Sequence, residues 1–502
     1  RDGLNAMYDF SEGILDLMLP SPEVVDYLGK PEMLFFGPDE GTAGFMDAVA
    51  YRGRERGYRY WRTLTTGKSF GIPHDVYGLT RDGRVFGLLS RDEAGTELQI
   101  DGETVIVTPD CHRLYQEIGD AIDTSGMTTM GVMASFRTVL DFLGMREEEI
   151  RLMMTGGPDG DLGGNQIQSF RGKICLLIDG GSVLYDPDGL NRTELVKLAL
   201  ARHTSPRLDS MAYPAECIGP RGFRVPRTPG PVRLPDGTEV PDGAYFHRRF
   251  LVDPAVRRLV ADAHIQAFLP CGGFKDTING ENVGVFLQNF PELRVIVEGA
   301  NVFFSDAARD WIARESNILQ IKDSTANKGG VTCSAIAEVL SMFLLGDRYE
   351  RVLVHDARLR SRFIGSIFQL IAHNAVAETR VLLNLRRKTG VPLHTLSVTT
   401  SEALLSLQDR LYRHLEAIAA DKEVVDAVIR AYVPAVLLEH LGLKRVLSLL
   451  NRPELRAYRD AILTKKIAAM ALYRYAEEWE ALTRRVEEDC LGTVREIVAG
   501  QA

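Results

Sequence analysis

The sequence predicts an α/β protein with a doubly wound parallel sheet, part of a second α/β domain and an all-helical C-terminal region. Short apolar runs read as buried strands, at residues 151–154, 174–178, 265–269, 295–297 and 318–321. Helical patterns alternate with these runs, and each run ends in a polar segment containing glycine, as in parallel β–α–β units. From residue 335 onward the apolar residues recur with a helical period throughout.

The turn after the first run is the main candidate for ligand binding. It contains Gly157, Gly160 and Gly163, and the next apolar run ends on Asp179. Glycines let backbone N–H groups approach a pyrophosphate, a helix N-terminus favours its charge, and an acid at this spacing accepts hydrogen bonds from ribose hydroxyls. The order predicts a Rossmann-type dinucleotide-binding domain, and Asp179 favours NAD because a carboxylate would repel the 2′-phosphate of NADP. The G-x-x-G-x-x-G spacing is one residue longer than usual, so a glycine-rich turn without a ligand is the alternative.

Composition limits the class of protein. A chain of 502 residues, 45% of them hydrophobic, can bury a core in two or three domains. The formal net charge of −9 and the lack of a long basic block argue against nucleic-acid binding. No apolar run reaches the roughly 18 residues that span a membrane, and no signal peptide is evident. The six cysteines form no C-x-x-C pair and accompany no histidine cluster, so we expect a cytoplasmic protein with reduced thiols and no metal.

The first acidic candidate is Asp39, in the segment Gly37–Thr42. Helices are expected at 10–19 and 22–28, and a buried strand at 33–36 leads into this turn. A carboxyl group in such a turn can exchange protons if the pocket is dry, because desolvation moves its pKa toward neutrality. The alternative is that Asp39 or Thr42 caps the following helix.

The remaining elements follow from local patterns. Residues 84–107 alternate apolar and polar positions between glycines, which predicts two or three antiparallel strands, and 234–240 reads as a hairpin in a segment rich in proline and glycine. Helices are expected at 111–122, 132–143, 192–201, 331–345, 360–388, 401–420, 424–440 and 455–485.

Two asparagines, Asn301 and Asn327, follow the runs at 295–297 and 318–321. Loops at the carboxyl ends of parallel strands line the ligand crevice, so both side chains are expected beside the coenzyme. Each could instead be a turn-forming asparagine without a ligand.

Seven separated motifs resemble, in the same order, the catalytic region of the large NAD-dependent glutamate dehydrogenases, over about residues 1–345. The motifs begin at Gly37, Thr65, Gly71, Gly126, Thr155, Glu298 and Asn327. The resemblance implies oxidative deamination of L-glutamate to 2-oxoglutarate and ammonia with NAD, in a cleft between a substrate domain and an NAD domain, usually within a homo-oligomer.

The same resemblance implies roles for single residues. Asp39 matches the catalytic aspartate, which exchanges protons with the amino group, water and ammonia. Gly157, Gly160, Gly163 and Asp179 match the dinucleotide contacts. Asn301 and Asn327 match asparagines at the nicotinamide end, and Ser334 matches a serine that contacts a substrate carboxylate.

Two departures from the family shape the expected organisation. Residues 79–122 interrupt the pattern, and the lysine-bearing motifs that should precede Asp39 are absent, since Lys30 is the only lysine before it. We therefore expect the carboxyl-terminal portion of a longer enzyme. The expected domains are the end of a substrate domain (1–78), an inserted subdomain (79–123), the NAD-binding domain (124–335) and a helical region (336–502). A non-catalytic NAD-binding regulatory paralogue, or a dehydrogenase for another amino acid such as leucine or phenylalanine, is the alternative.

Overall fold

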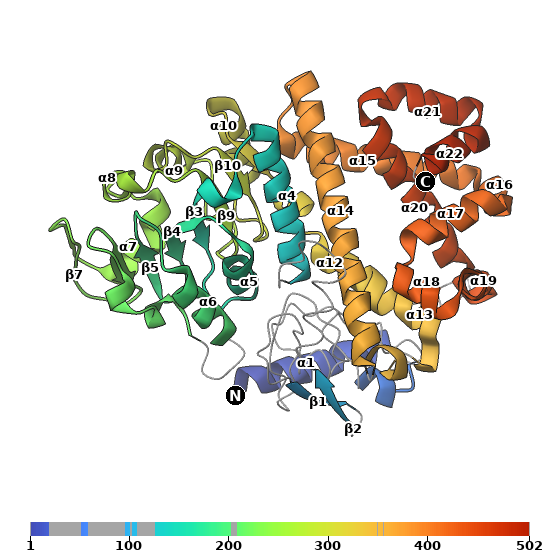
Figure 1. Cartoon of the computed structure of the whole chain (residues 1–502), viewed down its shortest axis with the longest axis horizontal. Coiled ribbons are helices and arrows are strands. Elements are labelled where there is room, and N and C mark those ends of the chain that lie inside the picture. The colour runs from blue at the N-terminus through green and yellow to red at the C-terminus, as the bar shows by residue number, and fades with distance from the viewer. Residues whose placement is uncertain are drawn as a thin grey trace. The chain divides into compact units, whose positions relative to one another are not determined.

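The protein divides into two compact units, seen in a computed structural model (Figure 1). The structure describes residues 2–19, 52–58, 96–100, 103–107, 126–201, 208–348, 350–354 and 356–500. Residues 123–329 and 371–398 form the sheet unit, and residues 1–122, 330–370 and 399–502 form the second unit. The elements expected at 22–28, 33–36 and 111–122, and the Asp39 turn, lie outside the described residues.

A seven-stranded sheet with the order β11-β10-β9-β3-β4-β5-β6 organises the sheet unit. Its strands are β3 (Arg151–Thr155), β4 (Lys173–Ile178), β5 (Ser182–Tyr185), β6 (Phe223–Pro226), β9 (Ala267–Pro270), β10 (Val295–Val297) and β11 (Leu319–Ile321). The five strands from β11 to β4 pair in parallel, which confirms the doubly wound sheet.

The sheet is mixed, however, and not wholly parallel as the pattern predicted. Strand β5 pairs antiparallel with β4, and β6 pairs antiparallel with β5. The backbone N–H of Asp179 donates to the carbonyl oxygen of Ser182 (3.1 Å), so the chain reverses directly after β4 through Gly180 and Gly181. A tight reversal produces an antiparallel neighbour, whereas a parallel one requires a longer crossover.

Both faces of the sheet are covered by helices (Figure 1). The helices are α4 (Met127–Leu143), α5 (Asp161–Ser169), α6 (Arg192–Ala201), α7 (Gly243–Arg249), α8 (Val256–Leu259), α9 (Val283–Asn289), α10 (Asp306–Glu315) and α11 (Asp323–Ala326). Helices α4, α5 and α6 pack on one face together with parts of α14 (Ala357–Thr389) and α15 (Leu393–Arg413). Helices α7 to α10 pack on the other face.

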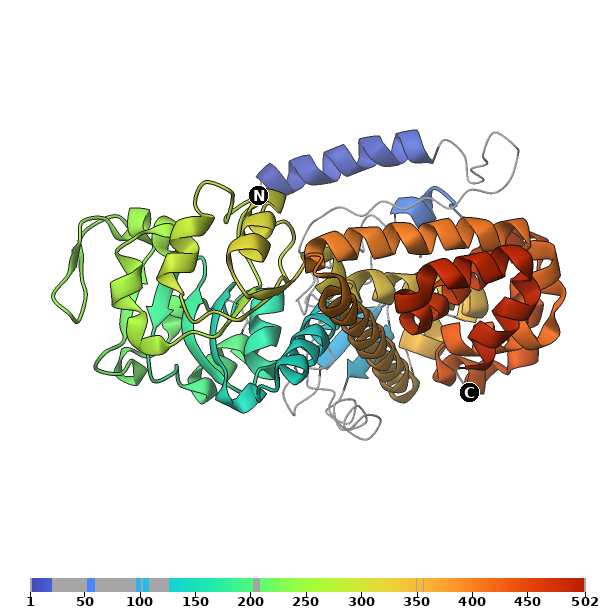
Figure 2. The same ribbon diagram turned by 90° about the horizontal axis from the view of Figure 1, so that it is seen from above.

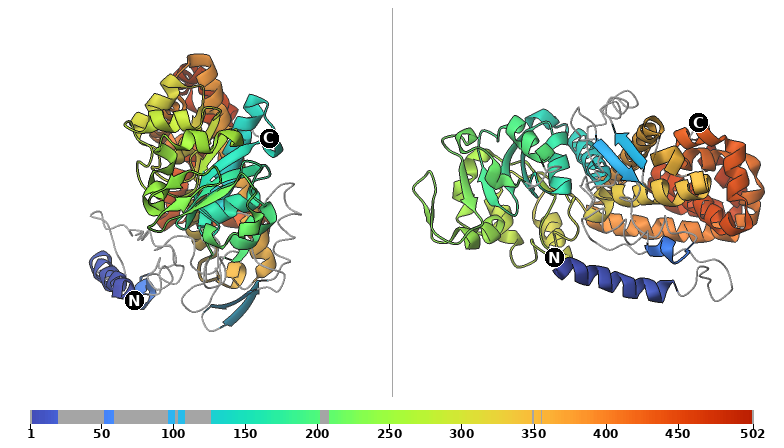
Figure 3. Two further views of the ribbon diagram at one scale, coloured as in Figure 1. Left: turned by 90° about the vertical axis from the view of Figure 1, so that its left-hand side faces the viewer. Right: turned by 90° about the horizontal axis from the view of Figure 1, so that it is seen from below.

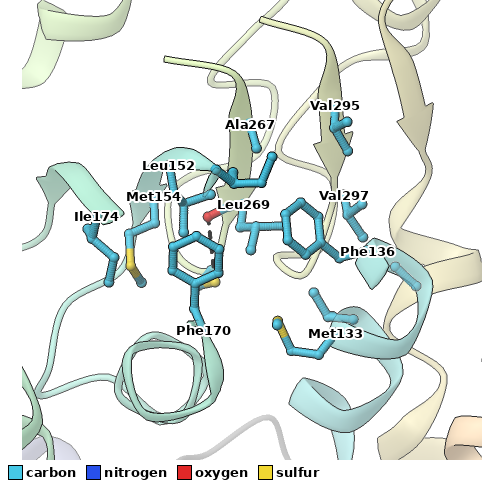
Figure 4. Close-up of a cluster of buried hydrophobic side chains, with 14 of the residues drawn as sticks. Met133, Phe136, Leu152, Met154, Phe170, Ile174, Ala267, Leu269, Val295 and Val297 are labelled. Atoms are coloured by element: carbon cyan, nitrogen blue, oxygen red, sulfur yellow. Dashed lines mark hydrogen bonds between the residues drawn. The ribbon is translucent and has the colours of Figure 1, made fainter. Parts of the chain in front are cut away.

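Strand residues alternate between these two cores. Leu152 and Met154 face the first core and Met153 the second, although all three are buried. Figure 4 shows the first core, where Phe136 of α4 and Phe170 meet edge to face with ring centroids 6.1 Å apart. Burial on both faces explains why these strands read as continuous apolar runs.

The second unit is mostly helical. Its helices include α1 (Asp2–Met18), α12 (Gly329–Cys333, which begins at the unit boundary), a π-helical segment (Ser334–Leu340), α13 (Ser341–Leu345), a second π-helical segment (Glu350–Val354), α16 (Leu415–Ala420), α17 (Lys422–Tyr432), α18 (Ala435–Leu441), α19 (Leu443–Leu450), α20 (Arg456–Tyr475), α21 (Trp479–Glu488) and α22 (Cys490–Ala499). Helix α1 is one straight element in Figure 2. The helix expected at 424–440 is two helices, since Pro434 separates α17 from α18 and proline removes a backbone donor.

The antiparallel strands expected within 84–107 occur as a hairpin. Strands β1 (Thr96–Ile100) and β2 (Glu103–Val107) pair antiparallel (Figure 3). A second small hairpin, β7 (Val232–Arg233) with β8 (Glu239–Val240), confirms the turn expected at 234–240.

The helical tail does not form one body. Residues 371–398 cluster with the sheet unit, while the rest of the region after residue 335 clusters with the second unit. Leu382, Leu383, Leu393 and Leu396 are buried in the first core, so this part of the tail covers the sheet. Among the described helices, none has the length and apolar character needed to cross a bilayer.

Candidate dinucleotide site

The candidate site lies where the winding of the sheet reverses. After β3 the chain continues to β4 on one side, and β9 occupies the other side of β3. The carboxyl ends of β3 and β9 therefore open a crevice, the usual ligand position in such sheets. Gly156 directly follows β3 and has a φ of 86°, and a Cβ there would lie 2.9 Å from the carbonyl carbon of Cys271. Only glycine allows the two strand ends to approach this closely.

Two glycines of the predicted turn are required by their surroundings. A Cβ on Gly157 would lie 2.0 Å from Oδ2 of Asp179, and one on Gly163 would lie 2.5 Å from the carbonyl oxygen of Gly157. Gly160 is different, because its nearest such contact is an ordinary 3.4 Å. It is the N-cap residue of α5. The turn is thus a cradle of bare backbone at a helix N-terminus, which suits a phosphate group.

Asp179 is buried against this cradle. Its Oδ1 accepts hydrogen bonds from the backbone N–H of Gly181 (2.8 Å) and Ser182 (3.0 Å) and from the Ser210 hydroxyl (2.5 Å). Among the described residues, its Oδ2 accepts only from the Ser210 N–H (2.8 Å), and it faces Gly157. Because each carboxylate oxygen offers about two acceptor positions, Oδ2 retains one on the cradle side.

His247 supports the same residue from α7. Its Nε2 lies 2.7 Å from the backbone carbonyl oxygen of Asp179, and its Nδ1 is buried without a hydrogen-bond partner among the described residues. Burial lowers the pKa of His247, so the neutral ring donates from Nε2. Ser182, Ser210 and His247 were not candidates in the sequence, since nothing in their local patterns indicates that they meet Asp179.

Asn301 and Asn327 lie together, as expected. Asn327 Nδ2 donates to Oδ1 of Asn301 (2.5 Å) and to the carbonyl oxygen of Gly299 (3.1 Å). Gly299 in turn donates to the carbonyl oxygen of Pro270 (3.1 Å), at the end of β9. The loops after β9, β10 and β11 therefore meet at the same edge of the sheet as the glycine cradle.

A buried charged cluster lies beneath these loops. Arg309 donates to both carboxylate oxygens of Glu298, from Nε (2.9 Å) and Nη2 (2.6 Å), and Gln320 Nε2 donates to Oε1 of Glu298 (2.9 Å). Burial raises the pKa of Glu298 to about 7, although Arg309 favours its charged form. Arg309 Nη2 also lies 3.6 Å from Oδ1 of Asp323. These contacts were not evident in the sequence, where only Glu298 lay in a recognised motif.

The structure does not test the other two predicted site residues, Asp39 and Ser334. Asp39 lies outside the described residues, and Ser334 is described only by its backbone, as the first residue of the π-helical segment Ser334–Leu340. Their roles stay predictions. Among the described residues, no three His, Cys, Asp or Glu side chains gather as metal ligands would.

Comparison with known proteins gives both a family and its relatives. Residues 119–346 match the family described as Glutamate/Leucine/Phenylalanine/Valine dehydrogenase. The chain is 32% identical over 479 residues to glutamate dehydrogenase 2 of Dictyostelium discoideum, covering 94% of this chain and 40% of that protein. It is 31% identical over 482 residues to a probable NAD-specific glutamate dehydrogenase of Schizosaccharomyces pombe, covering 94% of this chain and 37% of that protein.

Among solved structures, Plasmodium falciparum glutamate dehydrogenase 2 matches 49% of this chain and 44% of its own, with 18% identity and a TM-score of 0.32. The chain thus spans about two fifths of the length of the curated relatives it matches.

Proposed function

Because residues 119–346 belong to the glutamate/leucine/phenylalanine/valine dehydrogenase family, we propose that this protein acts in the NAD-dependent oxidative deamination of L-glutamate to 2-oxoglutarate and ammonia. Relatives named as glutamate dehydrogenases match along 94% of the chain, which supports this substrate. The observation that ties the proposal to this chain is the glycine cradle, where Gly157 lies directly against the carboxylate of Asp179.

The described residues fit NAD in distinct ways. Gly157 and Gly163 let the turn pack closely against Asp179 and against its own backbone, and the α5 N-terminus at this turn favours the negative charge of a pyrophosphate. The remaining acceptor position on Asp179 Oδ2 suits a ribose hydroxyl and disfavours a 2′-phosphate. The paired amides of Asn301 and Asn327 are our candidates for the nicotinamide end.

The reaction divides between coenzyme and protein. When bound, NAD accepts the hydride from the α-carbon of glutamate, and the chain supplies orientation and proton transfer. By its resemblance, Asp39 exchanges protons with the amino group, with ammonia and with water, and Ser334 binds a substrate carboxylate. The lysines that the family uses are absent before Asp39 in this sequence.

The test is glutamate-dependent reduction of NAD by the full-length protein, with leucine, phenylalanine and valine as alternative substrates and NADP as alternative coenzyme. We expect turnover with glutamate and NAD. The Asp39→Asn variant should lose most of it, whereas Glu40→Gln, a change in the adjacent acid, should keep more. NADH binding without turnover on any of these amino acids would favour the non-catalytic paralogue instead.

We also propose that the protein is a cytoplasmic homo-oligomer. The resemblance to the family supports the homo-oligomer. The five described cysteines are all free thiols, which supports the cytoplasmic compartment. Light scattering of the purified full-length protein tests the oligomeric state. Fractionation of the cells that produce the protein tests the compartment.

A further inference from the structure

The loop that carries Asn301 contains a strained residue. Val302 has a φ of 51°, in the left-handed region that β-branched residues rarely adopt. Its side chain is 44% exposed, so burial of the side chain does not offset this strain. Asp276, in the facing loop after β9, has a φ of 53°. Strained residues of this kind persist only where the surroundings hold them, and they gather at binding sites.

Hydrogen bonds hold Val302 from both sides. Its N–H donates to Oδ2 of Asp323 (2.6 Å), and its carbonyl oxygen accepts from the N–H of Asp276 (2.8 Å). The contact with Asp323 is charge-assisted and short, which makes it the stronger of the two. The residue before Val302 is Asn301, whose Oδ1 accepts a hydrogen bond from Asn327 Nδ2 (2.5 Å).

Asp323 is itself fixed in place. It is buried, its Oδ1 accepts from the N–H of Ser324 (2.7 Å), and Arg309 lies 3.6 Å away. Arg309 is held by both oxygens of Glu298, which directly follows β10. A chain of buried charges therefore runs from the end of β10 through α10 to Asp323, and ends on the backbone of Val302.

We propose that Asp323 is a positioning residue for coenzyme binding, which locks Val302 in its left-handed conformation and so presents the Asn301 amide. This inference rests on the proposed function, because Asn301 is assigned to the coenzyme there. Asp323 acts through the backbone of Val302. Arg309 and Glu298 hold the Asp323 carboxylate in the position where it accepts the Val302 N–H.

The test measures the dissociation constant of NADH by fluorescence titration of the full-length protein. Asp323→Asn should weaken NADH binding by about tenfold or more, because it replaces the charged carboxylate that accepts the Val302 N–H with a neutral amide. Asp306→Asn is the matched control. Asp306 also binds Arg309, through Nη1 (2.8 Å), but it is exposed and does not touch Val302, so binding should stay within about twofold.

A double variant separates positioning from general destabilisation. Glycine adopts a positive φ freely, so in a Val302→Gly background the Asp323→Asn change should cost less than about threefold in NADH affinity. In Asp323→Asn alone, hydrogen exchange should increase at residues 299–304. A purely structural role would lower the fraction of protein that binds and leave the dissociation constant of the folded protein unchanged.

Two results would overturn the inference alone. One is an NADH affinity of Asp323→Asn equal to that of wild type. The other is a loss of affinity on Asp323→Asn that is as large in the Val302→Gly background as in the wild-type background. A wild-type protein that fails to bind NADH would overturn the proposed function, and this inference with it.

Discussion

Gly157 shows how one missing side chain creates the proposed site. Its Cα lies so close to Asp179 that an added Cβ would overlap Oδ2 at 2.0 Å. The carboxylate has little freedom to move, because four hydrogen bonds from Gly181, Ser182 and Ser210 hold it. Glycine is therefore required here by the position of the acid itself.

The Gly157→Ala substitution should weaken NADH binding by at least about tenfold, equivalent to 1.4 kcal/mol. The added methyl group displaces Asp179 from its hydrogen bonds and fills part of the cradle. Fluorescence titration with NADH measures this loss. Gly180→Ala is the control, since a Cβ there would meet nothing within 4 Å, and it should bind NADH like the wild type. Equal affinities for Gly157→Ala and Gly180→Ala would contradict the assignment.

Glu298 makes stability depend on pH. Burial raises its pKa in the folded protein from 4.5 to about 7, so the folded state binds the proton more tightly than the unfolded state. Its contribution to stability is therefore complete below about pH 4.5 and is lost as the pH rises through 7.

From this group alone, the free energy of unfolding should fall by up to about 3 kcal/mol between pH 5 and pH 8. Urea unfolding of the wild type and of Glu298→Gln at several pH values measures the change. The pH dependence of the variant should be shallower, because the glutamine side chain does not titrate. A variant with the same slope as the wild type would show that another group titrates.

At the scale of an element, helix α10 begins with a side-chain cap. Ser305 is its N-cap residue, and the hydroxyl oxygen of Ser305 accepts from the N–H of Ala308 (3.2 Å). The helix also places Arg309 beneath the Asn301 loop. The start of α10 therefore stabilises both the sheet unit and the loop that we assign to the coenzyme.

Replacement of Ser305 by alanine should lower the free energy of unfolding by about 1 kcal/mol, because a helix N–H loses its acceptor. Thermal unfolding followed by circular dichroism checks this. Ser305→Asp should stay near the wild type, since a carboxylate caps equally well and is favoured at a helix N-terminus. If Asp destabilised as much as Ala, the hydroxyl would have a role other than capping.

At the scale of the molecule, the sheet unit depends on residues distant in the chain. Leu382, Leu383, Leu393 and Leu396 are buried in the first core, together with residues of β3, α4 and α5. Burial of each such side chain contributes about 1.5–3 kcal/mol, so the four together match the stability of a typical domain.

A fragment of residues 123–329 should therefore be poorly packed and should bind the dye ANS, which reports exposed apolar surface. Addition of a peptide of residues 371–398 should reduce the dye fluorescence and restore cooperative unfolding. The same peptide with the four leucines changed to serine is the control and should have no effect. A fragment 123–329 that unfolds cooperatively without the peptide would contradict this dependence.

The sequence by itself determined the strands of the parallel sheet, the glycine turn and the acid at the end of β4. These features are encoded in short windows, because a buried strand is a continuous apolar run and a close backbone approach needs glycine. The meeting of Asn301 with Asn327 also followed, since the carboxyl ends of parallel strands share one edge. The roles of Asp39 and Ser334 stay predictions.

Only the tertiary structure decided which residues fix those features in place. Ser210 meets Asp179 across 31 positions of sequence and His247 across 68, and Asp323 reaches Val302 across 21. The antiparallel β5 and β6 and the packing of residues 371–398 on the sheet are likewise long-range outcomes. The physical reason is the same in each case. A local pattern specifies whether a segment is a helix or a strand and which of its faces is buried. Which other segments it contacts depends on the order of the strands in the sheet and on which helices cover them, and both are set by the whole chain.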